Sequence, residues 1–225
     1  MLFTVYTKDF GKLEILGKSV RKIASKLRPS AEVFYLSEIE FIQGKIQKTL
    51  TDATLVDKFS GIRGDLKKIR IAHKISEVLD NLIKGQEPDE KIWQLLIETF
   101  RRLNSLEIKN LELEIIYCYF YWNFISTLGY RPELYHCVRC RKKIITERNY
   151  LVPEEGGIIC GLCKSEGRDI SPEAIKILRI ILKKDWPTLF KLKFDISPTL
   201  NSVLPSFLEF AILIMLGDKS RPVTA

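Results

Sequence analysis

Residues 137–163 read CVRCRKKIITERNYLVPEEGGIICGLC and contain four of the five cysteines of this 225-residue chain. The cysteines form two C-x-x-C pairs, Cys137 with Cys140 and Cys160 with Cys163, with nineteen residues between the pairs. Two loops of this kind hold one tetrahedral zinc ion, and four thiolates leave no open coordination position. The spacing therefore predicts one structural zinc ion per chain, in a zinc-ribbon insert that we place at residues 134–168.

Two disulfide bonds, or four unrelated core thiols, are the alternative interpretations of these pairs. Disulfides suit an oxidising compartment. The chain opens with MLFTVY and shows no basic n-region, long apolar stretch or small-residue cleavage site, so we expect a cytoplasmic protein and favour zinc. Cys118 lies in an aromatic run and is expected in the core, whereas His136, beside Cys137, is expected in a loop outside the metal shell.

Positive charge is concentrated near the start of the chain. The formal net charge is +8, and residues 8–28 hold seven basic residues against two acidic ones. These basic residues are Lys8, Lys12, Lys18, Arg21, Lys22, Lys26 and Arg28. A dense group of cations with few acidic neighbours is what a surface needs in order to follow a phosphate backbone, so the segment indicates an anionic partner.

The first sixty residues have the pattern of short strands. A β-branched and aromatic run over residues 2–7 is followed by a turn at residues 9–11 and an alternating stretch over residues 12–16. A second pair of runs covers residues 32–42 and 45–55. Several short strands with no helix between them predict a small antiparallel barrel or sheet, with a basic loop at residues 19–28.

After Gly61 the apolar period changes to that of helices. One helix is predicted up to Lys84, with Ile62, Leu66 and Ile69 on its buried face, and a second begins at Pro88. Residues 111–128 are apolar almost all round and predict the central helix of a bundle. Further helices are predicted after Ser171, after Ser197 and over residues 203–216, the last too short to span a membrane and interrupted by an acidic residue.

These elements in this order resemble the RecO family of bacterial recombination mediators, over nearly the whole chain. The stretches that carry the resemblance are TKDFGKL at residues 7–13, GKSVRK at 17–22 followed by SKL at 25–27, and LGYRPEL at 128–134, which leads into CVRC at 137–140. The first two are short strings of Lys and Gly. Their order, and the third stretch leading into the cysteines, make the resemblance specific.

The resemblance implies an α+β protein with an N-terminal OB-fold over residues 1–60 and a helical domain over residues 61–225 that carries the zinc insert. It implies no enzymatic turnover. Family members bind single- and double-stranded DNA, anneal complementary strands and help load recombinase, together with RecR and the C-terminal tail of single-stranded DNA-binding protein. We therefore expect a nucleoid-associated protein of the cytoplasm.

The resemblance also assigns DNA-binding residues by position. The residues that match the basic strand and loop of the family's DNA-binding barrel are Lys12, Lys18, Arg21, Lys22, Lys26 and Arg28. Family members usually carry a further strand before the turn that matches residues 7–12, so we expect a barrel that is incomplete or closed differently here.

Two other classes of function remain as alternatives. A zinc-ribbon protein of the transcription or translation apparatus would contact nucleic acid through the cations around the metal, which are Arg139, Arg141, Lys142, Lys143 and Lys164. A hydrolase or nuclease would need an open metal site or a nucleophile with its base, and the chain's two isolated histidines and scattered carboxylates form no such set.

Overall fold

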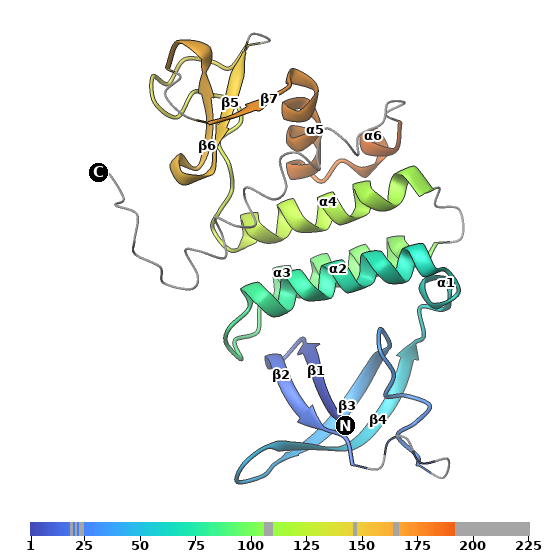
Figure 1. Ribbon diagram of the computed structural model, residues 1–225. Coiled ribbons are helices and arrows are strands. Elements are labelled where there is room, and N and C mark those ends of the chain that lie inside the picture. The colour runs from blue at the N-terminus through green and yellow to red at the C-terminus, as the bar shows by residue number, and fades with distance from the viewer. Residues whose placement is uncertain are drawn as a thin grey trace. The chain divides into compact units, whose positions relative to one another are not determined.

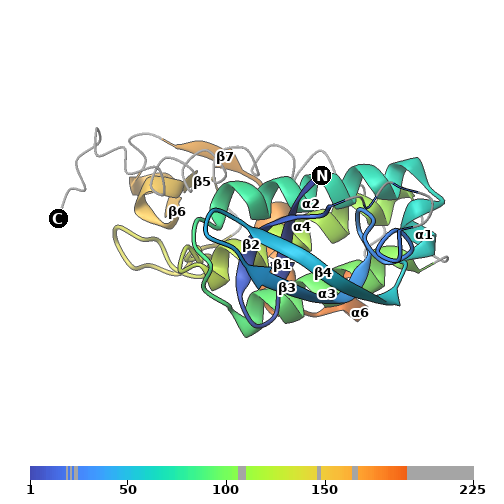
Figure 2. The same cartoon turned by 90° about the horizontal axis from the view of Figure 1, so that it is seen from below.

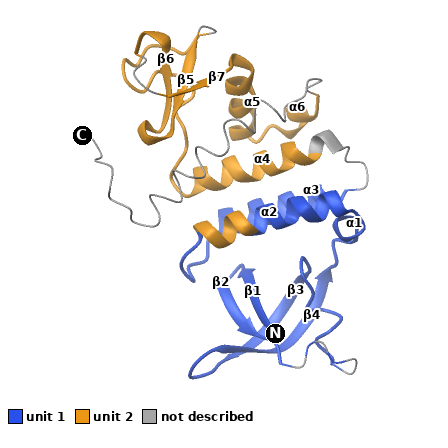
Figure 3. Ribbon diagram, in the orientation of Figure 1, with its two compact units in different colours: residues 1–76, 83–107 blue, residues 77–82, 108–225 orange. Residues whose placement is uncertain are grey.

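The computed structural model describes residues 1–18, 20, 22, 25–105, 110–145, 148–163 and 167–191 (Figure 1). The chain divides into two compact units (Figure 3). Unit 1 comprises Met1–Ser76 with Ile83–Glu107, and unit 2 comprises Glu77–Leu82 with Ile108–Ala225. The mixed α+β class expected from the sequence is confirmed, with a sheet in the N-terminal part and helices after it.

Unit 1 contains a four-stranded sheet in the order β1-β2-β4-β3, seen from below in Figure 2. Its strands are β1 (Leu2–Thr7), β2 (Gly11–Leu16), β3 (Leu36–Gln43) and β4 (Lys48–Asp57). β1 with β2, and β3 with β4, form antiparallel hairpins, but β2 and β4 pair in parallel, through Ile15↔Lys48 and Leu16↔Thr49. The predicted antiparallel arrangement is therefore confirmed within each hairpin and wrong at the seam between them.

The connection between the hairpins explains that seam. Residues 17–35 are long enough to carry the chain past the position beside β2, so that β3 lies at the outer edge and β4 pairs with β2. Among the described residues no pairing joins the outer strands β1 and β3. The sheet is thus open there, and a closed OB barrel stays a prediction.

The core of this sheet follows the alternation read from the sequence. Leu13, Ile15 and Leu50 are buried together. Leu27 and Ala31, from the connection between the hairpins, pack against them. A strand with one buried face needs this period of two. The apolar side chains of Leu27 and Ala31 hold the connection against the buried residues of the sheet.

The helices of unit 1 begin at residues that the sequence only partly identified. α1 (Ser60–Arg63) is a single turn, and α2 (Leu66–Leu82) follows it after a break; α2 ends within unit 2. Leu66, predicted to be buried, is 83% exposed, whereas Lys68 is 4% exposed and its Nζ donates a 2.5 Å hydrogen bond to the carbonyl oxygen of Ser105. The break after α1 makes Leu66 the first residue of a new helix, so the prediction is wrong at Leu66, whereas Ile62 is buried as predicted.

Helix α3 (Glu90–Asn104) begins two residues later than predicted. The side chain of Asp89 accepts hydrogen bonds from the backbone N–H groups of Lys91 and Ile92, at 2.7 and 3.0 Å. Asp89 is therefore the N-cap, and Pro88 precedes the helix instead of opening it.

The first turn of the sheet is locked to the segment between α2 and α3. Gly11 has a φ of 64°, and a Cβ atom placed there would lie 2.4 Å from the carbonyl oxygen of Glu87. Nζ of Lys12 donates to the carbonyl oxygen of Ile83 at 3.2 Å, and Nζ of Lys48 to Oε1 of Gln86 at 3.1 Å. The compact unit consequently extends beyond residue 60.

The domain limits drawn from the sequence, 1–60 and 61–225 with an insert at 134–168, stay a prediction. A compact unit is a set of residues with dense mutual contacts, and this density does not show which segments can fold alone.

Unit 2 is built on α4 (Asn110–Thr127), α5 (Pro172–Leu182) and α6 (Trp186–Lys191), with a second sheet in the order β6-β5-β7. Residues of α4 from Cys118 to Phe120 are fully buried, as predicted for a central helix. Nδ2 of Asn123 donates to the carbonyl oxygen of Ile181 at 3.1 Å, which ties α4 to α5.

The start of α5 is as predicted, since Oγ of Ser171 accepts a hydrogen bond from the N–H of Ala174 at 3.1 Å. α6 was not predicted. The helices expected after Ser197 and over residues 203–216 lie outside the described residues. Within the part of the chain that is described, no helix is long and apolar enough to cross a membrane.

Candidate metal centre and nucleic-acid interface

The first cysteine pair lies in a tight hairpin of residues 135–144. The N–H of Ile144 donates to the carbonyl oxygen of Tyr135 at 2.8 Å, and the N–H of Cys137 donates to that of Lys142 at 2.8 Å. Arg141 turns the chain with a φ of 62°. The hairpin therefore presents Cys137 and Cys140 from one curled loop, which is the geometry expected of a zinc knuckle.

The second pair follows a strand of the small sheet. The sheet comprises β5 (Asn149–Val152), β6 (Gly157–Cys160) and β7 (Arg168–Ile170). Cys160 ends β6, and the single turn η2 (Gly161–Cys163) carries the chain round to Cys163. A cysteine at a strand end followed by a turn again aims two sulfur atoms to one side.

Backbone hydrogen bonds join the first hairpin to β6. The N–H of Ile158 donates to the carbonyl oxygen of Glu133 at 3.1 Å, and the N–H of Val138 donates to that of Ile158 at 3.0 Å. A Cβ atom at Gly157 would lie 2.5 Å from the carbonyl oxygen of Glu133. Glycine at this position thus allows the close approach that brings the two cysteine pairs together.

The four sulfur atoms lie within 4.8 Å of one another. Sγ of Cys140 and Sγ of Cys160 are 3.7 Å apart. Tetrahedral zinc with Zn–S bonds of about 2.3 Å requires separations of about 3.8 Å between sulfur atoms, so the spacing fits the ion. All four thiols are free, and 3.7 Å is far beyond a disulfide bond of about 2.05 Å. The four cysteines can therefore bind a metal ion.

The thiols of the cluster need a nearby cation if all four are to be ionised. Burial disfavours the thiolate of Cys137, but backbone hydrogen bonds from Cys140, Cys160 and Arg139 lower the pKa of the Cys137 thiol to about 6. The Cys163 thiol lies against the side chains of Cys140 and Cys160, which raise its pKa to about 12. Four sulfur atoms so close cannot all ionise unless a cation neutralises them, and a divalent soft metal would do so.

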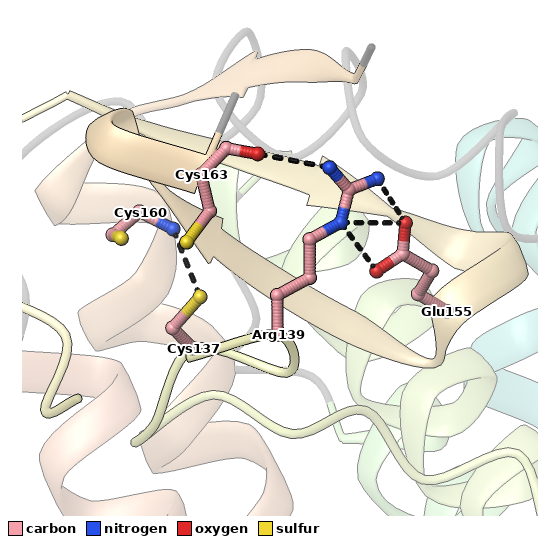
Figure 4. A network of polar contacts seen from close by, with 5 residues as sticks. All are labelled: Cys137, Arg139, Glu155, Cys160 and Cys163. Carbon is pink, nitrogen blue, oxygen red and sulfur yellow. Dashed lines mark hydrogen bonds and ion pairs between the residues drawn. The ribbon is translucent and has the colours of Figure 1, made fainter. Parts of the chain in front are cut away.

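Arg139, within the first pair, connects the two pairs (Figure 4). Its Nε donates to both carboxylate oxygens of Glu155, at 3.0 and 2.9 Å, and its Nη1 donates to the carbonyl oxygen of Cys163 at 2.9 Å. The hydrogen bonds from Arg139 lower the pKa of the Glu155 carboxyl. The guanidinium group therefore links the loop of the first cysteine pair to that of the second, and the carboxylate of Glu155 neutralises its charge.

Two residues that hold the ribbon were not singled out from the sequence. Oε1 of Glu133 accepts hydrogen bonds from the N–H groups of Tyr135 and His136, at 2.7 and 3.1 Å, and starts the first hairpin. Arg179 of α5 donates from Nε to the carbonyl oxygen of Leu134 at 3.1 Å. A carboxylate two residues before a turn is a weak sequence signal, and the partner of Arg179 is distant in sequence.

The structure also places the two side chains that were set apart from the metal. Cys118 is buried in α4, as expected. His136 is exposed beside Glu133, its Nδ1 3.9 Å from Oε1, and does not belong to the sulfur cluster.

The predicted DNA-binding residues separate into two groups. Lys18, Lys22, Lys26 and Arg28 are all exposed on the connection between the hairpins, where the buried Val20 anchors the chain. Lys12 lies apart from them, half-buried, with its ammonium group on the carbonyl oxygen of Ile83. Arg21 lies outside the described residues.

The connection is shaped by local turns. The N–H of Ser25 donates to the carbonyl oxygen of Lys22 at 3.0 Å, and the N–H of Ala31 donates to that of Leu27 at 2.9 Å. Leu27 packs on the sheet core and Val20 is buried, and the described cations between them, Lys22 and Lys26, are exposed. The arrangement can bind a polyanion by charge, without reading bases.

The fold and the site together define a two-unit α+β protein with an exposed basic connection on its first sheet and a four-thiol ribbon in its second unit. A family model described as "Recombination protein O C terminal" matches residues 63–210. The chain belongs to the RecO family, as the resemblance in its sequence predicted.

Relatives named DNA repair protein RecO are similar over most of the chain. The protein of Dehalococcoides mccartyi is 33% identical over 213 residues, which cover 94% of this chain and 80% of the relative. That of Moorella thermoacetica is 27% identical over 215 residues, covering 93% and 79%. That of Desulfitobacterium hafniense is 26% identical over 200 residues, covering 86% and 71%.

Proposed function

We propose that the protein is a mediator of DNA repair and homologous recombination that binds single- and double-stranded DNA and anneals complementary strands. The observation that carries this proposal is membership of the RecO family over a match of 94% of the chain. The exposed basic connection of unit 1 supports it, because it provides the surface that a DNA backbone needs. The reaction breaks no bond, so no catalytic residue is assigned.

Annealing by this surface would be an electrostatic effect. Two complementary strands repel each other as polyanions, and cations that replace their counterions lower that repulsion. Lys18, Lys22, Lys26 and Arg28, with Arg21 between them in sequence, would contact phosphates and leave the base edges free to pair. Lys12 would hold the sheet on the helices of unit 1, and its contact with DNA would be secondary.

Zinc would be structural in this protein. Cys137, Cys140, Cys160 and Cys163 would hold one ion, and its bound form supplies a cross-link between the first hairpin and β6. The separation of 3.7 Å between Sγ of Cys140 and Sγ of Cys160 supports this assignment. In addition to the ion, the hydrogen bonds of Arg139 to Glu155 and Cys163 and the backbone pairing at Glu133 would hold these loops together.

The proposed partners are RecR and the C-terminal tail of single-stranded DNA-binding protein, with which the protein would help to load recombinase onto coated strands. Its first sheet would act as the family's OB-fold. Its place would be the cytoplasm, in association with the nucleoid. The relatives' name, DNA repair protein RecO, supports these proposals at the level of the family.

The alternative of a zinc ribbon that itself contacts nucleic acid has less support. Arg139, one of its five cations, is held by Glu155 and by the carbonyl oxygen of Cys163. Arg141, Lys142 and Lys143 are exposed and would have to provide most of the affinity, and Lys164 lies outside the described residues. The variants compared at the end of the Discussion separate the two surfaces.

The test of the proposed function is strand annealing by the full chain. Duplex formation between two labelled complementary oligonucleotides is followed with and without the protein, in EDTA and without ATP. We expect the protein to accelerate pairing at concentrations that saturate the strands. No acceleration at any such concentration would contradict annealing and leave a role in DNA binding or as an adaptor.

A further inference from the structure

A pocket of about 370 Å³ lies in unit 2, and none of the four clustered cysteines lines it. Its lining comes chiefly from residues 131–135, from Arg141 of the first hairpin, from the turn at residues 155–156, and from Arg179 and Leu182 of α5. The pocket is therefore formed where the ribbon meets α5. Pockets that bind small molecules have volumes of about 300 to 1,000 Å³, so this one can hold a small ligand.

The positive charge of the pocket comes from arginine. Arg131, Arg141 and Arg179 line it, and among the described residues no lysine does. Lys142 and Lys143 of the same hairpin are exposed but lie outside the lining. A guanidinium group presents a planar fork of donors that matches two oxygen atoms of one anion, whereas an ammonium group acts as a point charge. The residue type therefore favours an anion with several oxygen atoms.

The two carboxylates that line the pocket are already engaged. Glu155 is held by Arg139, which lies outside the lining, and Glu133 accepts two backbone N–H groups of the first hairpin. Burial opposes ionisation of Glu133, but these hydrogen bonds and nearby charges, that of Arg141 among them, lower its pKa. Within the described residues, the guanidinium groups of Arg131 and Arg141 form no hydrogen bond. The lining thus keeps an excess of positive charge and unused donors.

The third guanidinium group, that of Arg179, is fixed in place. Its Nε and Nη2 both donate to the carbonyl oxygen of Leu134, and its central carbon lies 4.6 Å from the ring centre of Tyr135. Within the described part of the chain, its Nη1 donates to no protein atom. A group that is held before the ligand arrives has little freedom to lose on binding. Tyr135 itself is 41% exposed and keeps ring surface for a ligand.

The number and type of these groups select a phosphate monoester. Such a phosphate carries a charge of about −1.5 to −2 at neutral pH and three strong acceptor oxygens, whereas a carboxylate has one charge and two oxygens. Three guanidinium groups therefore match the phosphate better. An accessible aromatic ring beside the cations suits the flat face of a base, because bases stack on aromatic side chains. Phosphate and base together describe a nucleotide.

We propose that this pocket binds a soluble mononucleotide, with its phosphate on Arg131, Arg141 and Arg179 and its base on Tyr135. The ligand is one small molecule and the site lies in unit 2, so the proposal is independent of the DNA surface of unit 1. A nucleotide bound there contacts the first hairpin and α5 at once. It therefore stabilises the docking of the ribbon on α5, by mass action.

The test is isothermal titration calorimetry of the full chain with AMP, adenosine and inorganic phosphate. We expect AMP to bind, and adenosine to bind at least about tenfold more weakly, because it lacks the charged hydrogen-bond acceptors. Arg131→Gln/Arg141→Gln should weaken AMP binding at least about tenfold for the same reason. Tyr135→Leu should weaken AMP binding at least about threefold and change phosphate binding less than about twofold. Zinc content and circular dichroism verify that each variant is folded.

The matched control removes the same charge from the same hairpin, outside the lining. Lys142→Gln/Lys143→Gln should bind AMP within about twofold of the unaltered protein. Equal weakening in both glutamine variants would overturn the proposal, by showing diffuse attraction instead of a pocket. Absence of AMP binding to the unaltered protein at about 10 mM would overturn it directly. Inorganic phosphate that binds as tightly as AMP would overturn the nucleotide, and binding of only a 5′-phosphorylated oligonucleotide would identify a DNA end as the ligand instead.

Discussion

The four-thiol ribbon of unit 2 and the basic connection of unit 1 are specified in different ways. In the ribbon, four sulfur atoms lie within 4.8 Å of one another, and the neighbours Glu133 and Arg139 each have defined partners. In the connection, Lys18, Lys22, Lys26 and Arg28 share only their exposure. The ribbon therefore depends on geometry, and the connection depends on charge density.

The difference predicts how each region responds to substitution. A metal site with a closed set of ligands loses its function when one ligand is removed, because the remaining three no longer satisfy the ion. A surface that acts by counterion release loses affinity in steps, one cation at a time. The following predictions test that contrast.

The largest effect is expected from removal of a metal ligand. The protein should contain about one zinc ion per chain, and Cys140→Ser should contain none, because only a complete thiolate set holds the ion. Proteolytic cleavage within residues 133–163 should increase at least about tenfold, since the ion staples these loops. Elemental analysis and limited proteolysis measure both effects.

The matched control is Cys118→Ala, which removes a buried thiol outside the cluster and should keep the zinc. Binding of single-stranded DNA should change less than about twofold in Cys140→Ser, because the ribbon does not supply the phosphate contacts. If the unaltered protein contained no zinc, and thiol counting found none of the four cysteines free, disulfide bonds would instead be favoured.

A smaller effect is expected at Lys12, which was predicted to bind DNA and also forms a hydrogen bond within the protein. Because its Nζ bonds to the carbonyl oxygen of Ile83, Lys12→Ala should lower the free energy of unfolding by about 1 kcal/mol. Lys18→Ala, at an exposed residue of the basic connection, should change it by less than about 0.5 kcal/mol. Urea denaturation followed by circular dichroism compares the two. Equal stability of both variants would mean that the Lys12 hydrogen bond contributes nothing.

The smallest effect is expected at Glu155. Arg139 lowers the pKa of this carboxyl below its ordinary value of 4.5, so the ion pair stabilises the ribbon above that pH, and the stabilisation is lost as pH falls through the lowered pKa. At pH 7, Glu155→Gln should raise the rate of ribbon proteolysis by at most about fivefold, because the pair is partly exposed.

The pH dependence of that difference is the check. The unaltered protein and Glu155→Gln should become indistinguishable below the lowered pKa, and differ by a constant factor from about pH 6 to 8. An acid-tolerant protease suits this comparison, in which acid release of zinc affects both proteins alike. A difference that persists in acid would contradict the role given to the ion pair.

Local signals predicted much of the fold. The cysteine spacing, the Ser171 cap and the apolar run of α4 depend on neighbours in sequence, and each is confirmed as a feature of the structure. Leu66 was placed wrongly because the helix breaks after Arg63 and begins again at Leu66, which is exposed. The partner of Lys12 is 71 residues away, and no local pattern could reveal it.

The candidate sites show the same division. The four cysteines could be predicted to lie together because a metal imposes a fixed spacing, whereas Glu133 and Arg179 act through backbone atoms that any residue carries.

The most direct test of the proposed DNA surface is the salt dependence of single-stranded DNA binding in two variants that each remove three cations. For Lys18→Ala/Arg21→Ala/Lys22→Ala we expect the slope of log affinity against log salt to flatten by about 0.7 to 0.9 for each phosphate that the protein no longer neutralises. For Arg141→Ala/Lys142→Ala/Lys143→Ala, in the ribbon, we expect an unchanged slope. An unchanged slope in the first variant, with a flattened slope in the second, would contradict the assignment and place the DNA surface on the zinc ribbon.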